Sequence, residues 1–239
     1  MLLHIPHVLR PTELAQVRQL MLAADWADGR LTAGSQSGSV KHNLQLPEEL
    51  PAAQQARYLV SVALARSPMF VTGTLPKSVY PPLFNRYLGG SVTNRFGDHV
   101  DNAPRTNATT AQHVRSDISC TLFLNDPASY GGGVLVVQDT YGEHRIKFNA
   151  GDLVMYPGTS VHRVEPVTHG ERLVSFFWIE GMVRADAQRR LLYDMDTAII
   201  SLRCKDQAIT LQGATDCAEV VQLTGCFHNL LRMWADIRI

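Results

Sequence analysis

The sequence has few cysteines, and none of them has the spacing of a metal knuckle or a disulfide framework. Its four cysteines are scattered, and no pair forms a CxxC motif (Cys120, Cys204, Cys217 and Cys226). This pattern argues against a zinc knuckle and against a dense set of disulfides. Reduced cysteines are the simplest interpretation, so we expect a cytoplasmic protein.

An excess of charge of one sign is also missing, and so are long apolar runs. The 22 Lys and Arg residues equal the 22 Asp and Glu residues, so no global field favours nucleic acid or a membrane surface. Met1–Arg10 contains no basic segment before a long apolar run, so we expect no secretory signal. No stretch approaches the roughly 18 apolar residues of a membrane span. The partner class must therefore come from individual sites.

The composition is that of a soluble globular protein, with 45% apolar and 18% charged residues in 239. Residues 1–78 are predicted to form an N-terminal helical flank. Pro11 suits a first helical turn, and apolar residues then recur at helical spacing. A second amphipathic run surrounds Ala56–Ala63, whereas Gly29–Ser39 is rich in Gly, Ser and Thr and is predicted to be a loop.

Residues 79–182 show a different pattern, in which short β-branched and aromatic runs alternate with turn residues. Many short strands at close intervals predict an antiparallel sandwich or barrel. A parallel sheet would need helical crossovers, for which the sequence leaves no room. The expected strands are Leu83–Leu88, Ile118–Asn125, Val134–Asp139, His144–Phe148, Leu153–Tyr156, Ser160–Pro166 and Arg172–Glu180.

Residues 183–239 return to helical periodicity. Apolar residues between Leu191 and Leu202 share one helical face, and a last helix is expected over Glu219–Asp236. These helices could cover the β-core or form a dimer surface, and we favour a homo-oligomer. The predicted fold class is therefore mainly β with flanking helices.

The first candidate site is the HxD pair formed by His99 and Asp101. On an extended chain, residues two apart point to the same face and lie about 6–7 Å from each other. An imidazole nitrogen and a carboxylate oxygen together suit a first-row transition metal. Because HxD is common by chance, the pair alone indicates little.

Two further residues support a metal site at the HxD pair. His162 lies in a predicted strand just after the Pro157-Gly158 turn, and Arg172 begins a strand ten residues later. Taken singly, His162 fits a structural histidine and Arg172 an arginine that reaches water. Two histidines and a carboxylate, however, form a facial triad that leaves three iron positions open. 2-Oxoglutarate would occupy two of these iron positions through its 1-carboxylate and 2-oxo group. The planar guanidinium of Arg172 suits the carboxylate at its other end.

At these residues the chain resembles the iron(II)- and 2-oxoglutarate-dependent oxygenases, and most closely the bacterial PKHD-type hydroxylases. The likeness covers most of the chain from about Tyr80 onward. It is carried by the segments Phe84–Tyr87, His99–Asn102, Thr121–Asn125, Gly132–Leu135, Gln138–Gly142, Gly151–Pro157, Met182–Arg184 and His228–Trp234. One departure is the Tyr87–His99 spacing, which is a few residues longer than the family pattern.

The resemblance implies a double-stranded β-helix, or jelly roll, with iron ligands at His99, Asp101 and His162. It implies that Arg172 binds 2-oxoglutarate, that Tyr87 contacts it, and that Trp178 lies near the metal. From the sequence, Tyr87 and Trp178 fit equally well as aromatic residues of the core. It also suggests hydroxylation of a prolyl or lysyl side chain, L-ascorbate as a further cofactor and a link to iron homeostasis. The substrate itself, whether protein or small molecule, is not identified.

Two other functions fit parts of the pattern. A non-catalytic sensor of iron or 2-oxoglutarate could use the same site, and coupled decarboxylation would distinguish it from an enzyme. A cupin-like zinc or manganese protein could use the triad, but its chemistry would not need Arg172. The remaining histidines offer no tighter ligand spacing, and His113 is the one nearest to the HxD segment.

Overall fold

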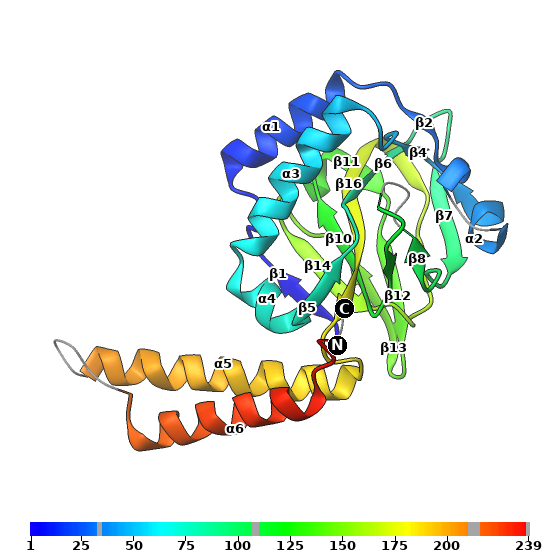
Figure 1. Cartoon of the computed structure of the whole chain (residues 1–239). Helices are drawn as coiled ribbons and strands as arrows, with labels where there is room; N and C mark the ends of the chain where they lie inside the picture. The colour runs from blue at the N-terminus through cyan, green and yellow to red at the C-terminus, as the bar shows by residue number, and fades with distance from the viewer. Residues whose placement is uncertain (33–34, 107–109, 210–215, 238–239) are drawn as a thin grey trace.

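The chain forms two antiparallel β-sheets that face each other, with helices on the outer face of one sheet and a helical hairpin at one end (Figure 1). The computed structural model describes residues 1–32, 35–106, 110–209 and 216–237. Every strand pair within these residues is antiparallel. The mainly β class with flanking helices is confirmed.

The larger sheet is built around its longest strand, β16 (Val167–Gly181). This strand lies between β10 (Ile118–Phe123) and β6 (Leu83–Leu88), with Arg172 directly opposite Tyr87. The other strands of this sheet are β1 (Leu3–Ile5), β2 (Ala27–Asp28), β4 (Leu44–Gln45), β5 (Pro76–Val79), β11 (Tyr130–Gly132) and β14 (Leu153–Pro157).

The smaller sheet carries the two histidines of the predicted triad. His99 and His162 are opposite each other on β7 and β15. A separate two-stranded ribbon consists of β8 (Arg105–Thr106) and β9 (His113–Val114). In order, the smaller sheet contains β13 (Gly142–Ile146), β12 (Leu135–Asp139), β15 (His162–Val164), β7 (Arg95–His99) and β3 (Lys41–His42).

Two cores hold these layers together. Helices α1 (Pro11–Leu22), α3 (Pro51–Ala65) and α4 (Pro68–Thr74) pack on the outer face of the larger sheet (Figure 1). A second core lies between the sheets and contains Leu135, Val154 and Val174. Because strand side chains alternate, β16 supplies Leu173 and Phe177 to the first core and Val174 to the second.

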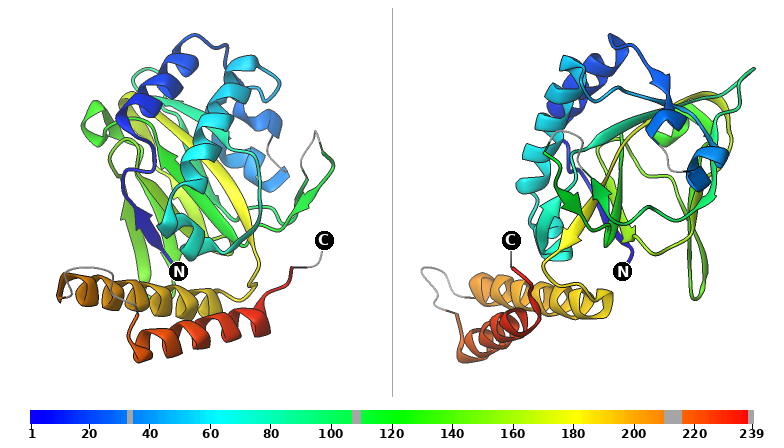
Figure 2. Two further views of the ribbon diagram at one scale, coloured as in Figure 1. Left: turned by 60° about the vertical axis from the view of Figure 1, so that its left-hand side comes forward. Right: turned by 45° about the vertical axis from the view of Figure 1, so that its right-hand side comes forward.

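The C-terminal segment is a helical hairpin that projects from one end of the β-core (Figure 2). It consists of α5 (Asp186–Ile209) and α6 (Ala218–Trp234). The backbone N–H of Asp236 donates to the Met182 carbonyl at 2.7 Å, so the hairpin closes beside the end of β16. Among the described residues, no helix combines the length and apolar character that crossing a membrane would require.

The N-terminal flank differs in one respect from the prediction, because it is not only helical. It supplies five short strands, β1 to β5, to the two sheets. The expected loop at Gly29–Ser39 contains a 3-10 turn (Gly29–Thr32) and the helix α2 (Ser35–Val40), while residues 33–34 lie outside the described residues. Strands of two to four residues are too short to show an alternating pattern, so the sequence could not indicate them.

Candidate metal centre

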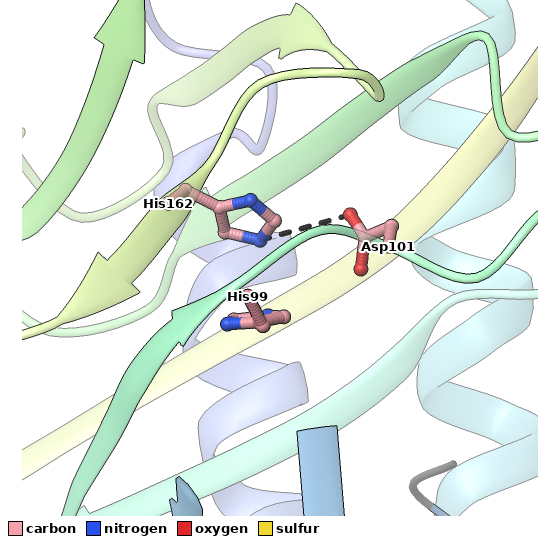
Figure 3. A group of neighbouring side chains, drawn as sticks. All are labelled: His99, Asp101 and His162. Atoms are coloured by element: carbon pink, nitrogen blue, oxygen red, sulfur yellow. Dashed lines mark ion pairs between the residues drawn. The ribbon is translucent and has the colours of Figure 1, made fainter. Parts of the chain in front are cut away.

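The side chains of His99, Asp101 and His162 point toward one another between the two sheets (Figure 3). One ligand atom from each lies within 4.8 Å of the others. The His162 Nε2 is 3.7 Å from the Asp101 Oδ2. Both histidines are about 5% exposed, and Asp101 is half-buried just beyond the end of β7. These two nitrogens and one oxygen could hold one transition-metal ion.

The backbone fixes the tautomer of both histidines. The Nδ1 of His99 lies 2.8 Å from the Gly97 carbonyl, and the Nδ1 of His162 lies 3.1 Å from the Ser160 carbonyl. Because a carbonyl oxygen can only accept, each Nδ1 must carry the hydrogen and donate it. Each Nε2 therefore keeps its lone pair for a metal, with the ring orientation set by its own strand.

The electrostatics of the triad keep His99 neutral and Asp101 charged. Burial, together with the neighbouring His162, lowers the pKa of His99 to about 4. Burial raises the pKa of Asp101, but His162 and the hydrogen-bond donors Ser119 and Trp178 outweigh it, so that pKa is lowered overall. The Ser119 hydroxyl donates to the Asp101 Oδ2 at 2.6 Å. Neutral imidazole and ionised carboxylate are the forms that bind metal.

Arg172 is buried in the same pocket without a partner for its charge. It is 1% exposed, and its three guanidinium nitrogens have no hydrogen-bond acceptor among the described residues. Its guanidinium carbon lies 5.1 Å from the centre of the Tyr87 ring. Leaving a buried cation unpaired costs several kcal/mol, so such a group indicates an absent anionic ligand. A guanidinium matches a carboxylate through two parallel hydrogen bonds.

A single pocket joins all the residues predicted from the sequence. It contains about 700 Å³ of empty space, part of it open to solvent. The triad, Arg172 and Tyr87 all line it. The inward face of β16 forms one wall, through Arg172, Val174, Phe176 and Trp178.

Other pocket residues were not predicted from the sequence. Lys41 and Arg105 also line the pocket, and each lies on a two-residue strand. Ser119, which holds Asp101, faces the pocket from β10. Alternation along β10 was visible in the sequence, but nothing in it showed which face would meet the triad.

His113, the other histidine nearest to the HxD segment in the sequence, lies outside the pocket. It is exposed on β9, where its Nδ1 lies 3.0 Å from the Thr106 hydroxyl. Within the described residues, only His99, Asp101 and His162 form a group that could hold a metal ion.

Two family models match the chain. Residues 82–180 match the 2OG-Fe(II) oxygenase superfamily, and residues 186–236 match the PKHD-type hydroxylase C-terminal domain. A PKHD-type hydroxylase from Xanthomonas campestris pv. campestris (strain B100) is 54% identical over 239 residues, covering 99% of this chain and 100% of the relative. This chain belongs to the PKHD-type hydroxylases. Another member, from Phenylobacterium zucineum, is 51% identical over 237 residues, with 99% and 100% coverage.

Solved structures share the fold of this PKHD-type hydroxylase at low sequence identity. A prolyl hydroxylase from Trichoplax adhaerens, in complex with a hypoxia inducible factor peptide fragment, has a TM-score of 0.53 and 14% identity. It covers 80% of this chain and 86% of its own. A 2OG-Fe(II) oxygenase family oxidoreductase from Burkholderia pseudomallei has a TM-score of 0.51 and 19% identity, with 74% and 84% coverage. The jelly-roll core is thereby confirmed.

Family membership makes the protein an oxidoreductase of the dioxygenase class that uses Fe²⁺ and 2-oxoglutarate. The residues of the pocket fit both groups. Two histidines with free Nε2 atoms and one carboxylate suit iron(II). The unpartnered guanidinium of Arg172 suits a carboxylate of 2-oxoglutarate.

Proposed function

We propose that His99, Asp101 and His162 hold the iron(II) of this hydroxylase, and that Arg172 binds the far carboxylate of 2-oxoglutarate. Tyr87 would contact the same cosubstrate, since it is directly opposite Arg172 in the sheet and is buried beside the guanidinium. The observation that carries the proposal is the unpartnered guanidinium of Arg172 in the pocket that contains the triad.

The protein residues would orient the reactants and keep water out. Bound iron(II) would supply oxygen activation, coupled to decarboxylation of 2-oxoglutarate to succinate and carbon dioxide. The carbonyls of Gly97 and Ser160 keep both imidazoles turned toward one point, and Ser119 holds the carboxylate there. Val174 and the rings of Phe176 and Trp178 form an apolar wall that limits solvent at the reacting C–H bond.

We infer that a prolyl or lysyl side chain is the first substrate class to test. The inference is supported by the relatives, which are hydroxylases, and by the prolyl hydroxylase that shares the fold. A protein and a small molecule both remain candidates for the partner. The link to iron homeostasis, the use of L-ascorbate, the homo-oligomer and the cytoplasmic location stay predictions.

The role of Arg172 can be tested by calorimetric titration of 2-oxoglutarate into iron(II)-loaded protein without oxygen. Arg172→Met should weaken binding at least about a hundredfold, because a charge-assisted bidentate contact is lost from a buried site. Without ligand, the same variant should be at least as stable as the wild type, since an unpaired buried charge has been removed. Equal 2-oxoglutarate affinity in the two proteins would refute the assignment.

Matched variants separate this result from general damage. Arg86→Met removes an arginine from β6 whose partner is the carboxylate of Glu171, and it should leave 2-oxoglutarate affinity unchanged. His162→Ala should abolish iron binding, whereas His113→Ala should retain it, because His113 is exposed outside the pocket. Iron affinity that is the same in both histidine variants would exclude the triad.

A further inference from the structure

Arg172 is not the only cation in the pocket that lacks a counter-ion. Lys41 is 3% exposed, and its ammonium donates to a neutral group, the Gln45 Oε1, at 2.9 Å. Arg105 is half-buried and makes no hydrogen bond or ion pair with any residue that the structure describes. Its guanidinium carbon lies 3.9 Å from the centre of the Trp178 ring. Burial lowers the pKa of Lys41 to about 8, so the side chain is mostly charged at neutral pH.

The carboxylates that interact electrostatically with Lys41 and Arg105 are already engaged with other groups. Asp28 pairs with Arg30, and Glu48 pairs with Arg57 at 2.6 Å. The third, Asp101, belongs to the metal triad and accepts from Ser119. Lys41 and Arg105 are therefore two positive charges in one pocket for which the described part of the chain provides no dedicated anion, and this is costly unless a ligand supplies one.

Lys41 and Arg105 lie far from Arg172, as their contacts along strand β16 indicate. Lys41 Nζ lies 5.7 Å from the centre of the Phe176 ring, and Arg105 stacks on Trp178, two residues further along the same face. Trp178 lies six positions after Arg172, which is roughly 20 Å along an extended strand. One anion of ordinary size cannot reach both ends of this wall.

The charges of the pocket with iron(II) and 2-oxoglutarate bound also indicate that a second anion is needed. Arg172, Lys41 and Arg105 carry three positive charges, iron(II) adds two, and Asp101 contributes one negative charge. The two carboxylates of 2-oxoglutarate add two negative charges. Two positive charges then remain, and both belong to the end of the pocket at Lys41 and Arg105.

We propose that Lys41 and Arg105 form a second anion subsite, which binds a carboxylate of the substrate while its C–H bond faces the metal triad. This inference rests on the function proposed above and adds the chemical class of the substrate. The rings of Phe96, Phe176 and Trp178 surround the two cations, so an apolar group next to the carboxylate fits best. Arg105 also lines a neighbouring hollow with Glu48 and Tyr80, so a longer substrate can continue outward there.

The test uses probes that differ only in charge. The full-length protein is loaded with nickel(II) and saturated with 2-oxoglutarate, so that Arg172 is occupied. Binding is then measured by ligand-observed NMR for 3-phenylpropanoate and for 3-phenylpropanamide. A second pair, N-acetyl-aspartyl-phenylalanine amide and its asparaginyl counterpart, distinguishes a peptide side chain from a free terminal carboxylate.

At least one acid should bind about tenfold or more tightly than its neutral twin, as expected for charge-assisted hydrogen bonds. Arg105→Gln and Lys41→Gln should each remove most of this preference and leave 2-oxoglutarate affinity unchanged. Arg95→Gln serves as the matched control, because Arg95 is exposed on β7, and it should keep the preference.

Three results would overturn the subsite. The first is equal binding of the acid and the amide in both pairs. The second is a preference for the acid that survives in both Arg105→Gln and Lys41→Gln. The third is competition between the acid and 2-oxoglutarate. The last would place the probe at Arg172. If the wild type failed to bind 2-oxoglutarate, the function proposed above would be refuted instead. Failure of the subsite and failure of the proposed function are therefore distinguishable.

Discussion

At the scale of single residues, the pocket is built from groups that cost stability in the absence of ligand. Arg172 and Lys41 are almost completely buried cations, and neither has a carboxylate partner among the residues that the structure describes. A fold selected for stability alone would replace such charges with apolar side chains of similar size. Their presence is better explained by binding, and this explanation predicts variants that gain stability while they lose function.

Lys41→Met should be such a variant, with a gain in stability that is measurable in the metal-free protein. A fall of the Lys41 pKa from 10.5 to about 8 corresponds to about 3 kcal/mol of unfavourable charge burial. Below pH 8 both the native and the unfolded state hold the proton, so the full cost acts on the wild type. Between about pH 8 and 10.5 the unfolded state holds more protons, and wild-type stability therefore rises with pH.

The variant should accordingly exceed the wild type in free energy of unfolding by about 3 kcal/mol at neutral pH. The difference should shrink toward zero as the pH approaches 10.5, and urea unfolding across this range measures it. Lys77→Met is the control, because Lys77 has the carboxylates of Glu180 and Asp236 nearby and should show no such gain. A stability difference that does not change with pH would argue against a cost of charge burial at Lys41.

At the scale of elements, the turn between β11 and β12 shapes the space around Arg172. Gly133 has φ +62, and a Cβ there would lie 3.0 Å from the Arg172 Cδ and from the Tyr130 ring. The glycine therefore serves two purposes. It permits the left-handed turn, and it leaves room for the guanidinium stem.

Gly133→Ala should weaken 2-oxoglutarate binding about tenfold or more, because Arg172 must move from its position. It should also lower the free energy of unfolding by about 1–2 kcal/mol through left-handed strain. Gly142→Ala provides the comparison, since Gly142 has φ +131 but open space around its Cβ position. That variant should lose stability and keep its affinity, and a similar loss of affinity in both would contradict the steric explanation.

The elements also show how far the sequence could predict this protein. Strands such as β6, β10 and β14 were predicted within two residues at each end. In contrast, β16 begins five residues before the predicted Arg172, and β7 was not among the predicted strands. The triad was identified because its spacing follows from strand geometry and from the family motif. Lys41 and Arg105 were missed because two-residue strands have no period, and their position depends on pairing with or packing against distant residues such as Phe96 and Trp178.

At the scale of the whole molecule, both ends of the chain meet the start of the C-terminal hairpin. The terminal amino group of Met1 pairs with Asp186, and the N–H of Asp236 donates to the Met182 carbonyl. Thr72 adds a hydrogen bond from α4 to Asp196 on α5 at 2.8 Å. The hairpin is thus attached to the β-core through a small set of contacts around residues 181–196.

Arg189 is the central contact of this attachment. It is 2% exposed, and its Nη1 donates to the carbonyls of Val183 at 2.8 Å and Arg184 at 2.6 Å. Its Nη2 donates to the Asp186 Oδ1 at 3.1 Å. The side chain therefore fixes the angle at which α5 leaves β16, because it bonds to the backbone of the connecting segment.

Arg189→Met should loosen the hairpin without disturbing the metal pocket. The buried Val183 carbonyl would lose its donor, at a cost of about 1–3 kcal/mol, and the partly buried Arg184 carbonyl would lose the same donor at a smaller cost. We expect faster amide hydrogen exchange over residues 182–196, with iron and 2-oxoglutarate affinities unchanged. Arg190→Met is the matched control, since Arg190 is exposed and pairs with Asp194 within α5. Equal exchange in the two variants would show that the hairpin is held by its apolar contacts with Leu75 and Val183 rather than by Arg189.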